Sequence, residues 1–281
     1  MPIVVRQDRE FLFTEKDFNY LRKVANEYSG ITVSDDKYDM YYARIAKRVR
    51  SLGLSDFSDY CKYLKNNHQK EFTNFINSIT TNLTSFFREN YHFEYLESHI
   101  IPEHKKNHAS KKSFRIWCAA ASTGEEPYSL AITLAENFNL NTWDIKFLAT
   151  DIDSDVLNKA RNGVYESQRI SNLSSTRKNR WFRKGTGENK GVVRVDEELR
   201  ELISFKRLNL IQEWPIRKKF DVIFCRNVFI YFDGPTKEMI LERFYDLLND
   251  DGYLILGHSE SIHSMSTDYK AVGHTIYRKI I

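Results

Sequence analysis

The feature that most constrains the fold is an alternation of short apolar runs with helical segments, which begins at residue 114. The apolar runs have the composition of buried strands, and the segments between them carry apolar residues at helical spacing. Strands that alternate with helices predict a mainly parallel sheet covered by helices on both faces. The expected strands are 114–120, 145–149, 220–225 and 253–256, and the expected helices are 127–138 and 236–248.

The first third of the chain has a different pattern. Residues 14–98 carry helical signals without a strand pattern: Thr14 and Asp17 are spaced as an N-cap pair, and apolar residues recur at helical spacing from Phe18 onward. A polar stretch over residues 104–113 then breaks the periodicity. We therefore expect an all-helical N-terminal domain over residues 1–105 and an α/β domain over residues 106–281.

A glycine-rich turn interrupts the α/β pattern. Gly185, Thr186 and Gly187 lie in a polar stretch, and the β-branched run 192–195 follows it. A polar turn before such a run predicts a hairpin. We expect a small antiparallel β subdomain, inserted into the α/β domain at about residues 177–205.

Composition argues against several functional classes. The formal net charge is only +4, so the field of the whole protein gives no reason to expect nucleic-acid binding. Cys61, Cys118 and Cys225 lie far apart without metal-ligand spacing, so we expect no metal site and a reducing, cytoplasmic setting. No apolar run approaches the roughly 18 residues of a membrane span, so we expect no membrane insertion.

Three features fall at the carboxyl ends of expected strands, where an open parallel sheet binds its ligand. The small-residue turn 119–127 lets backbone approach a ligand, although a plain turn capped by Ser122 or Thr123 is the commoner meaning of such a sequence. Asp151 ends the next strand and is placed either to accept ribose hydroxyls or to cap a helix. Arg226 and Asn227 end an almost wholly apolar strand, where a polar pair is costly without partners; this favours a ligand-facing role, with hydrogen bonding between domains as the alternative.

Together these features predict a nucleoside-binding α/β domain without phosphate-binding machinery. The sequence contains no Walker A, HExxH or nucleophile-elbow motif, which argues against the commoner hydrolases. This combination fits S-adenosylmethionine better than a dinucleotide.

Five motifs, in this order, resemble those of the CheR family of chemotaxis receptor methyltransferases. The resemblance covers about residues 14–278 and implies a Rossmann-like S-adenosylmethionine-dependent methyltransferase domain with an inserted antiparallel β subdomain and an N-terminal all-helical domain. It implies that the enzyme transfers a methyl group from S-adenosylmethionine to glutamate side chains of chemoreceptors, which yields glutamyl methyl esters and S-adenosylhomocysteine during chemotactic adaptation. The motifs are TTNLTSFFRE at 80–89, AAASTGEEPYS at 119–129, ATDID at 149–153, FDVIFCRNVFIYFD at 220–233 and GHSE at 257–260.

The resemblance also implies site residues, motif by motif. Tyr231 matches a tyrosine beside the methyl-transfer site and is the expected catalytic residue. Without the resemblance, Phe86 and Phe87 would be interpreted as core aromatics and Arg88 as part of a solvated surface. The implied cofactor-binding residues are Asn82, Thr84, Arg88, Glu125, Asp151, Asn209, Leu210, Asn227 and Val228.

The segment 37–50 is the expected receptor-docking helix. It carries five basic residues and one acidic residue, and a solvated helix face is the usual meaning of such charges. The resemblance assigns it instead to docking on the acidic methylation region of the receptor, where opposite potentials accelerate encounter. The expected docking residues are Arg44, Lys47, Arg48 and Arg50.

The glycine-rich turn has a second expected role. An exposed sheet edge pairs with an extended peptide through main-chain hydrogen bonds. The resemblance points to family members with such a turn that tether to a receptor C-terminal peptide, whereas a solubilising turn is the plain alternative. The expected tether residues are Gly185, Thr186 and Gly187.

Two other functions stay open from the sequence. One is an S-adenosylmethionine-dependent methyltransferase that acts on RNA or a small molecule, supported by local basic stretches and many aromatic residues. The other is a nonenzymatic adaptor that binds the cofactor only as a structural ligand. The intact Asp151, Asn227 and Tyr231 argue against the adaptor.

Overall fold

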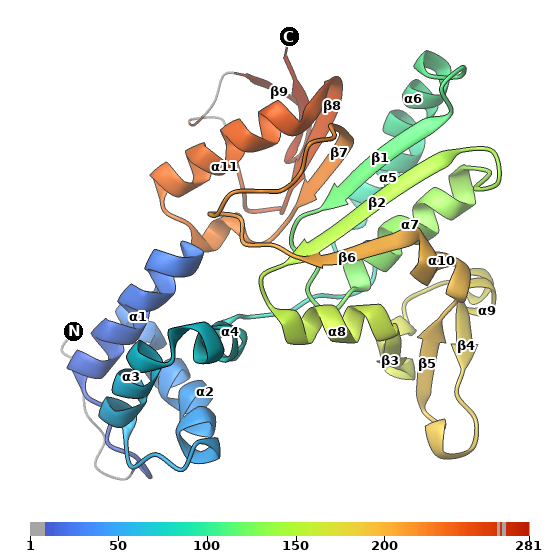
Figure 1. The fold of residues 1–281 in the computed structure, drawn as a ribbon. Helices are drawn as coiled ribbons and strands as arrows, with labels where there is room; N and C mark the ends of the chain where they lie inside the picture. The colour runs from blue at the N-terminus through green and yellow to red at the C-terminus, as the bar shows by residue number, and fades with distance from the viewer. Residues whose placement is uncertain (1–8, 263–264, 266–267, 281) are drawn as a thin grey trace.

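The computed structural model describes residues 9–262, 265 and 268–280. A cluster of helices forms the N-terminal part, and a twisted sheet with helices on both faces forms most of the rest (Figure 1). Aromatic rings that are almost fully buried, including those of Phe18, Tyr41 and Tyr60, fill the core of the N-terminal part. Its helices are α1 (Glu15–Ser29), α2 (Tyr38–Ser51), α3 (Phe57–Asn66) and α4 (His68–Ile79).

Helix α1 begins where the sequence predicts. Thr14 and Asp17 form a reciprocal capping box, so the expected N-cap is confirmed. Gly30 ends the helix in the left-handed conformation, with φ of 73°. A Cβ atom at Gly30 would lie 2.8 Å from a side-chain carbon of Ile211, so glycine also permits close contact with the α/β part of the chain.

The main sheet has the strand order β6-β2-β1-β7-β8-β10-β9. The pairings from β6 to β8 are all parallel, which confirms the expected mainly parallel sheet. A C-terminal antiparallel hairpin that was not predicted extends the sheet beyond β8. The strands are β1 (Ser113–Cys118), β2 (Asp144–Asp151), β6 (Ile203–Arg207), β7 (Phe220–Cys225), β8 (Leu248–Leu256), β9 (Tyr269–Gly273) and β10 (Ile276–Lys279).

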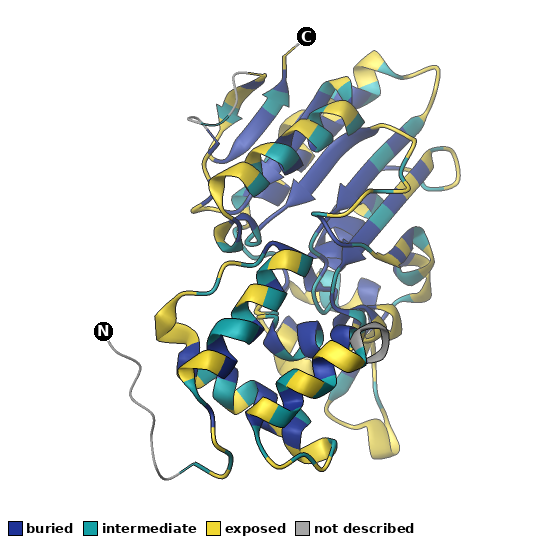
Figure 2. Ribbon diagram, turned by 60° about the vertical axis from the view of Figure 1, so that its left-hand side comes forward, coloured by how far each residue is buried: buried dark blue, intermediate teal, exposed yellow. Residues whose placement is uncertain are grey.

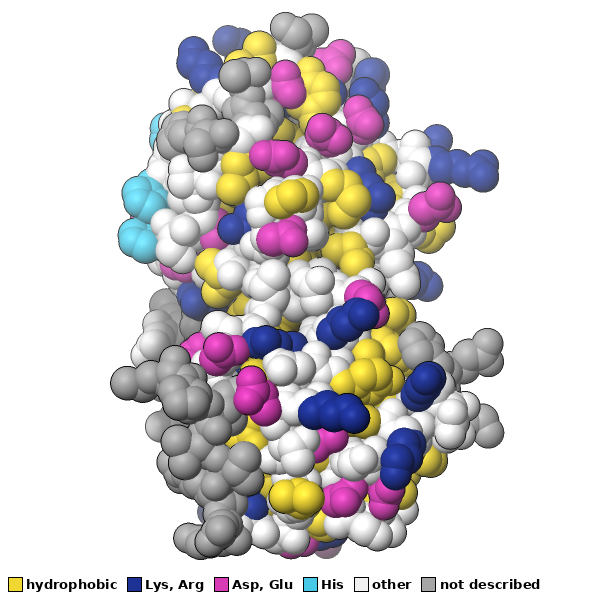
Figure 3. All heavy atoms as spheres, turned by 90° about the vertical axis from the view of Figure 1, so that its left-hand side faces the viewer, with side chains coloured by type: hydrophobic (Ala, Val, Ile, Leu, Met, Phe, Trp, Pro, Cys, Tyr) yellow, Lys and Arg dark blue, Asp and Glu magenta, His cyan; other side chains and the backbone are white. Residues whose placement is uncertain are grey.

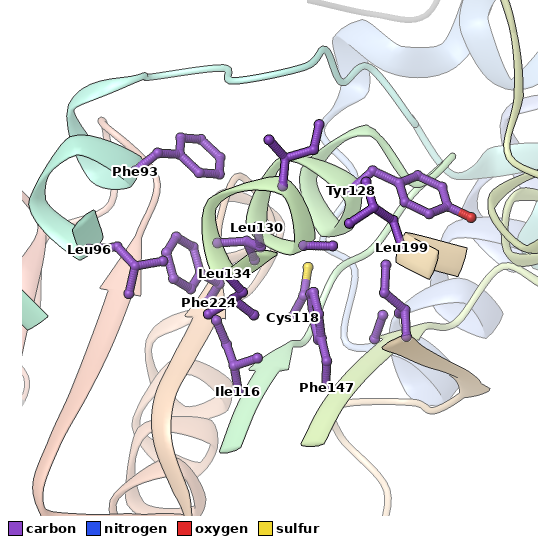
Figure 4. Packing of buried hydrophobic residues seen from close by; sticks show 14 of the residues in the cluster. Phe93, Leu96, Ile116, Cys118, Tyr128, Leu130, Leu134, Phe147, Leu199 and Phe224 are labelled. Atoms are coloured by element: carbon purple, nitrogen blue, oxygen red, sulfur yellow. The ribbon is translucent and has the colours of Figure 1, made fainter. Parts of the chain in front are cut away.

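Helices bury both faces of the parallel strands, and Figure 2 shows the buried sheet between them. On one face, Phe93, Leu130 and Leu134 pack toward Ile116 and Phe224 (Figure 4). On the other, buried residues of α11 pack in a second cluster with the outer side of β1 and β7. The helices of this part are α5 (Tyr91–Tyr95), α6 (Ile101–Asn107), α7 (Glu125–Asn137), α8 (Ser154–Asn162), α9 (Ser175–Trp181), α10 (Glu197–Leu202) and α11 (Gly234–Leu247).

The chain passes from the core of the N-terminal helices to the core of the sheet between residues 79 and 86, before the expected boundary at residue 105. The core of the N-terminal helices ends with Ile79, and residues from Phe86 through Ile101 pack in the core of the sheet. Residues 80–90 are not helical, although the sequence pattern predicted helix through residue 98. Helix α5 continues through a π-helical turn into α6 and covers the sheet, so its apolar face belongs to the α/β part.

A second, smaller sheet has the order β3-β5-β4 and is antiparallel, as expected for the inserted subdomain. Its strands are β3 (Val164–Glu166), β4 (Phe182–Lys184) and β5 (Val192–Val195). The expected hairpin joins β4 to β5, and Gly185 N–H donates to the carbonyl of Val192 at 2.9 Å. The insertion begins at β3 rather than at residue 177, and residues 203–207 form β6 of the main sheet instead.

Candidate active site

A cavity of about 810 Å³ lies at the carboxyl ends of β1, β2, β6 and β7. Its floor comes from the strand ends and the turns that follow them, as expected for an open parallel sheet. One wall comes from the N-terminal part: the segment 29–44 and the linker after α4. The site therefore includes residues from both parts of the chain. The sequence did not indicate that the segment 29–34 would line it.

Asp151 ends β2 at the cavity with only 9% of its surface exposed. Its carboxylate accepts the backbone N–H of Ser122 at 2.8 Å and that of Asp153 at 2.9 Å. Burial raises the pKa of Asp151 to about 6, although these N–H groups act against the rise. Near neutral pH the group is therefore a mostly ionised acceptor at the base of the cavity.

Asp153, two residues later, ties the linker to the sheet. Its carboxylate caps α8 by accepting the N–H groups of Asp155 and Val156. Its other oxygen accepts hydrogen bonds from Thr80 Oγ1 at 2.7 Å and from Asn82 Nδ2 at 2.9 Å. The capping role that the sequence offered for Asp151 thus belongs to Asp153.

Arg226 directly follows β7 and has a side chain with no exposed surface. Its Nη1 donates to Glu126 at 2.5 Å, and its Nη2 donates to Glu89 at 2.9 Å and to the carbonyl of Arg88 at 2.6 Å. Burial lowers the pKa of Arg226, but the charges of Glu126 and Glu89 outweigh it and raise that pKa overall. We call Arg226, Glu126 and Glu89 the buried clamp; it joins β7, α7 and the linker.

Asn227 follows in a left-handed conformation, with φ of 58°. Its N–H donates to Glu260 at 2.8 Å, and its side chain donates to Glu89 at 3.2 Å. Burial raises the pKa of Glu260, and the N–H groups of Gly257, Asn227 and Ile230 act in the opposite direction. The GHSE motif thereby fixes the turn that carries residues 227–230 past the cavity.

The turn after β1 has a structural reason for its glycine. Gly124 has φ of 100°, and a Cβ atom there would lie 2.6 Å from the Tyr165 hydroxyl and 2.9 Å from Ala160. The glycine therefore serves packing against α8 and the small sheet, whereas Ala119, Ala120 and Ser122 line the cavity.

Most of the residues expected at the site come together around the cavity. Tyr231 lies there with its carbonyl held by Thr32, which donates from both N–H and Oγ1 at 2.8 and 2.9 Å. Glu125 differs, because its carboxylate pairs with Arg169 and accepts Thr123 Oγ1 away from the lining. The expected residues that line the cavity are Asn82, Thr84, Arg88, Asp151, Asn209, Leu210, Asn227, Val228 and Tyr231.

The expected docking residues on α2 have different surroundings. Arg44 donates to the carbonyls of Ile79 and Thr80 at 2.6 and 2.8 Å and lines the cavity. Arg48 forms a two-pronged pair with buried Glu71, with N–O distances of 2.9 and 2.6 Å. Arg50 pairs with exposed Glu10, whereas Lys47 is exposed and has no ion pair among the described residues.

Basic and acidic side chains are interspersed on the face shown in Figure 3, which includes part of the N-terminal helices. Of the four expected docking residues, Arg48 and Arg50 form ion pairs with Glu71 and Glu10, whereas Arg44 donates to backbone carbonyls. Lys47 is the residue of the four that is left without a partner within the described part of the chain.

Sequence reasoning missed the acidic half of the buried clamp. Glu89 and Glu126 lie in quoted motifs, but nothing in their spacing indicated that both would converge on Arg226. The only available signal was that a charged residue at the end of a buried strand requires partners.

None of the helices in the described residues is both long and apolar enough to cross a membrane. No group of three or more His, Cys, Asp or Glu side chains in those residues is arranged to hold a metal ion.

Comparison with known proteins gives consistent matches over both parts of the chain. Residues 82–278 match the family model of the CheR methyltransferase SAM-binding domain, and residues 16–80 match that of the CheR methyltransferase all-alpha domain. The change from one model to the other falls at the end of α4.

Three relatives are similar over nearly their whole lengths. The chemotaxis protein methyltransferase of Escherichia coli K12 is 42% identical over 277 residues, which cover 98% of this chain and 94% of the relative. Chemotaxis protein methyltransferase 2 of Pseudomonas aeruginosa is 42% identical, with 98% and 97% covered. The chemotaxis protein methyltransferase of Borreliella burgdorferi is 37% identical, with 89% of each chain covered. With both family models and these relatives in agreement, the chain belongs to the CheR methyltransferases, which use S-adenosylmethionine.

Proposed function

We propose that this enzyme transfers a methyl group to glutamate side chains of chemoreceptors and forms glutamyl methyl esters. The observation that carries the proposal is the ionisable lining of the cavity. Among the described lining residues there is no histidine or cysteine, and both lining carboxylates, Glu126 and Asp151, are buried in hydrogen bonds. A cavity without a free general base suits a nucleophile that arrives ionised, as a solvent-exposed glutamate with its ordinary pKa of about 4.3 does.

The cavity fits the family's cofactor. Asp151 is a buried strand-end acceptor suited to ribose hydroxyls, and Arg88 is a cation suited to a carboxylate. Arg226 adds a buried Nε that has no hydrogen-bond partner among the described residues. Asn82, Thr84, Asn209, Leu210, Asn227 and Val228 complete the proposed cofactor site.

S-adenosylmethionine supplies a methyl group on a positively charged sulfur. The protein's task is to hold the substrate carboxylate in line and to exclude water, which accounts for roughly 7 kcal/mol or more of barrier reduction in well-oriented reactions. Tyr231 is the proposed catalytic residue because it lines the cavity and carries a hydroxyl that can donate a hydrogen bond. A hydrogen bond from that hydroxyl would orient the carboxylate.

The proposal includes two contacts away from the cavity. Lys47, with neighbouring positive charge on α2, accelerates encounter with an acidic receptor segment. The turn of Gly185, Thr186 and Gly187 offers the edge of β4 to a receptor C-terminal peptide, which raises the local substrate concentration. A cytoplasmic location follows from these partners.

The test supplies the enzyme with methyl-labelled cofactor and either a receptor cytoplasmic fragment or total RNA. We expect label on the receptor fragment that mild base releases as methanol. Tyr231→Phe should lower kcat roughly tenfold or less, since a purely orienting hydrogen bond contributes about 1 kcal/mol. Label on RNA, or base-stable label on the fragment, would refute the proposal.

A further inference from the structure

We propose that the side chains of Leu83 and Ile230 form an aliphatic rim at the mouth of the cavity that grips apolar side chains beside the substrate carboxylate. The inference rests on the proposed function and specifies the peptide on which that function acts. The substrate segment would carry its glutamate between aliphatic neighbours.

The exposure of these two residues sets them apart. Leu83 is 77% exposed and Ile230 is 52% exposed, yet both line the cavity. A side chain that lines a cavity and is mostly in solvent lies at its opening. Single exposed aliphatic residues need no explanation, but two at one cavity mouth leave apolar surface where a substrate enters.

The linker backbone around Leu83 is fixed although its side chain is in solvent. The carbonyl of Leu83 accepts Arg88 Nη1 at 2.9 Å. The carbonyl of Asn82 accepts Ser122 Oγ at 3.1 Å, and that of Thr84 accepts Arg169 at 2.9 Å. Three consecutive carbonyls therefore accept side-chain hydrogen bonds, which hold the backbone that carries Leu83.

Ile230 is held in a similar way. Its N–H donates to buried Glu260 at 3.2 Å, and the next carbonyl, that of Tyr231, accepts two hydrogen bonds from Thr32. Apolar side chains on an ordered backbone lose little entropy when a partner covers them. Both residues thus have the properties of preorganised contact residues.

Charge at the mouth indicates the chemistry of the partner. The lining carboxylates are buried, whereas Arg44 is partly exposed and Lys37, which pairs with Asp36, is exposed. Arg44 donates to carbonyl and hydroxyl oxygens, so no carboxylate cancels its charge there. Cations beside aliphatic side chains complement a carboxylate with aliphatic neighbours. A nucleic-acid base would instead favour exposed aromatic side chains for stacking.

The test compares Leu83→Ser, Ile230→Ser and the double variant with Leu12→Ser, a control that alters another exposed leucine. Leu12 is 60% exposed and does not line the cavity. The substrate is a receptor cytoplasmic fragment without its C-terminal tail, which removes any contribution from a tether. Methyl-ester formation gives KM and kcat, and calorimetry gives the affinity for S-adenosylmethionine.

We expect each rim variant to raise KM for the fragment roughly fivefold, which corresponds to about 1 kcal/mol of lost apolar contact. The double variant should raise it roughly 25-fold if the residues act independently. Leu12→Ser should leave KM for the fragment unchanged. The affinity for S-adenosylmethionine should stay the same in every variant, and an unchanged affinity also shows that the variant is correctly folded.

An unchanged KM in the double variant would overturn the rim while leaving the proposed function intact. Weaker cofactor binding with an unchanged KM would overturn it too, because the two side chains would then belong to the cofactor site. Failure of the unsubstituted enzyme to form base-labile esters would instead refute the proposed function, and the rim with it.

Discussion

Replacing Arg226 with methionine removes the cation of the buried clamp and leaves Glu126 and Glu89 without it. The Arg226 side chain has no exposed surface and donates to both carboxylates. Breaking a buried ion pair from one side costs about 3–5 kcal/mol, because a buried charge loses its partner. That is a large part of the roughly 5–15 kcal/mol by which most domains are stable.

The loss should also depend on pH. Burial already raises the pKa of Glu126, and removing Arg226 raises that pKa further. A carboxyl whose pKa in the folded state lies above its unfolded value contributes stability at low pH, and this contribution is lost as the pH rises through the folded pKa. The deficit of Arg226→Met relative to the unsubstituted enzyme should therefore be smaller near pH 5 than near pH 7.

Urea denaturation at both pH values measures the deficit, and Arg180→Met is the matched control. Arg180 pairs with Glu198 on the surface, where the side chains are 55% and 44% exposed, so its loss should cost under about 1 kcal/mol. Arg226→Lys should fall between the two, because it keeps the charge without the planar fork. Equal losses in Arg226→Met and the control, or a deficit independent of pH, would refute this account of the clamp.

Three further predictions concern binding. Asp151→Asn should weaken S-adenosylmethionine binding by about 1.5–3 kcal/mol per lost hydrogen bond. In the unsubstituted enzyme the affinity should decline as the pH falls below about 6, where the Asp151 carboxylate takes up a proton, and the variant should lack this decline. If calorimetry gives the same affinity and the same pH profile for both proteins, Asp151 does not belong to the site. Lys47→Glu should slow receptor methylation, most at low salt, and spare cofactor affinity; an unchanged rate at low salt would show that Lys47 takes no part in docking. Deleting Gly185–Gly187 should abolish binding to a receptor tail peptide without changing cofactor affinity, and retained peptide binding, or no receptor tail that binds the intact enzyme, would argue against the tether.

The parallel sheet was predictable because its strands carry their own signal. All six residues of β7 are buried and five of them are apolar, and such a nearly continuous apolar run indicates a central parallel strand. The C-terminal hairpin β9–β10 carries no comparable signal, since most of β9 is exposed. The expected helix 236–248 matches α11, whereas β8 begins at Leu248, before the expected start of that strand at residue 253.

The candidate site was predictable only in part, since its contacts join distant segments. Strand-end residues such as Asp151 were identified from their place in the sheet. The partners of Arg48 and Arg226 were not, because Glu71 and Glu126 lie 23 and 100 positions away from them. A helical pattern does not indicate against which core a helix packs: α5 lies before the expected boundary near residue 105, yet it packs on the sheet.

Mapping the modified atoms tests the central claim most directly. A receptor cytoplasmic fragment is incubated with the enzyme and labelled S-adenosylmethionine, and peptide mass spectrometry locates the label before and after mild base. We predict methyl groups on glutamate carboxylates, lost in base, and none on a fragment whose modified glutamates are replaced by glutamine. Methyl groups that survive base, or equal labelling of the glutamine fragment, would contradict the account.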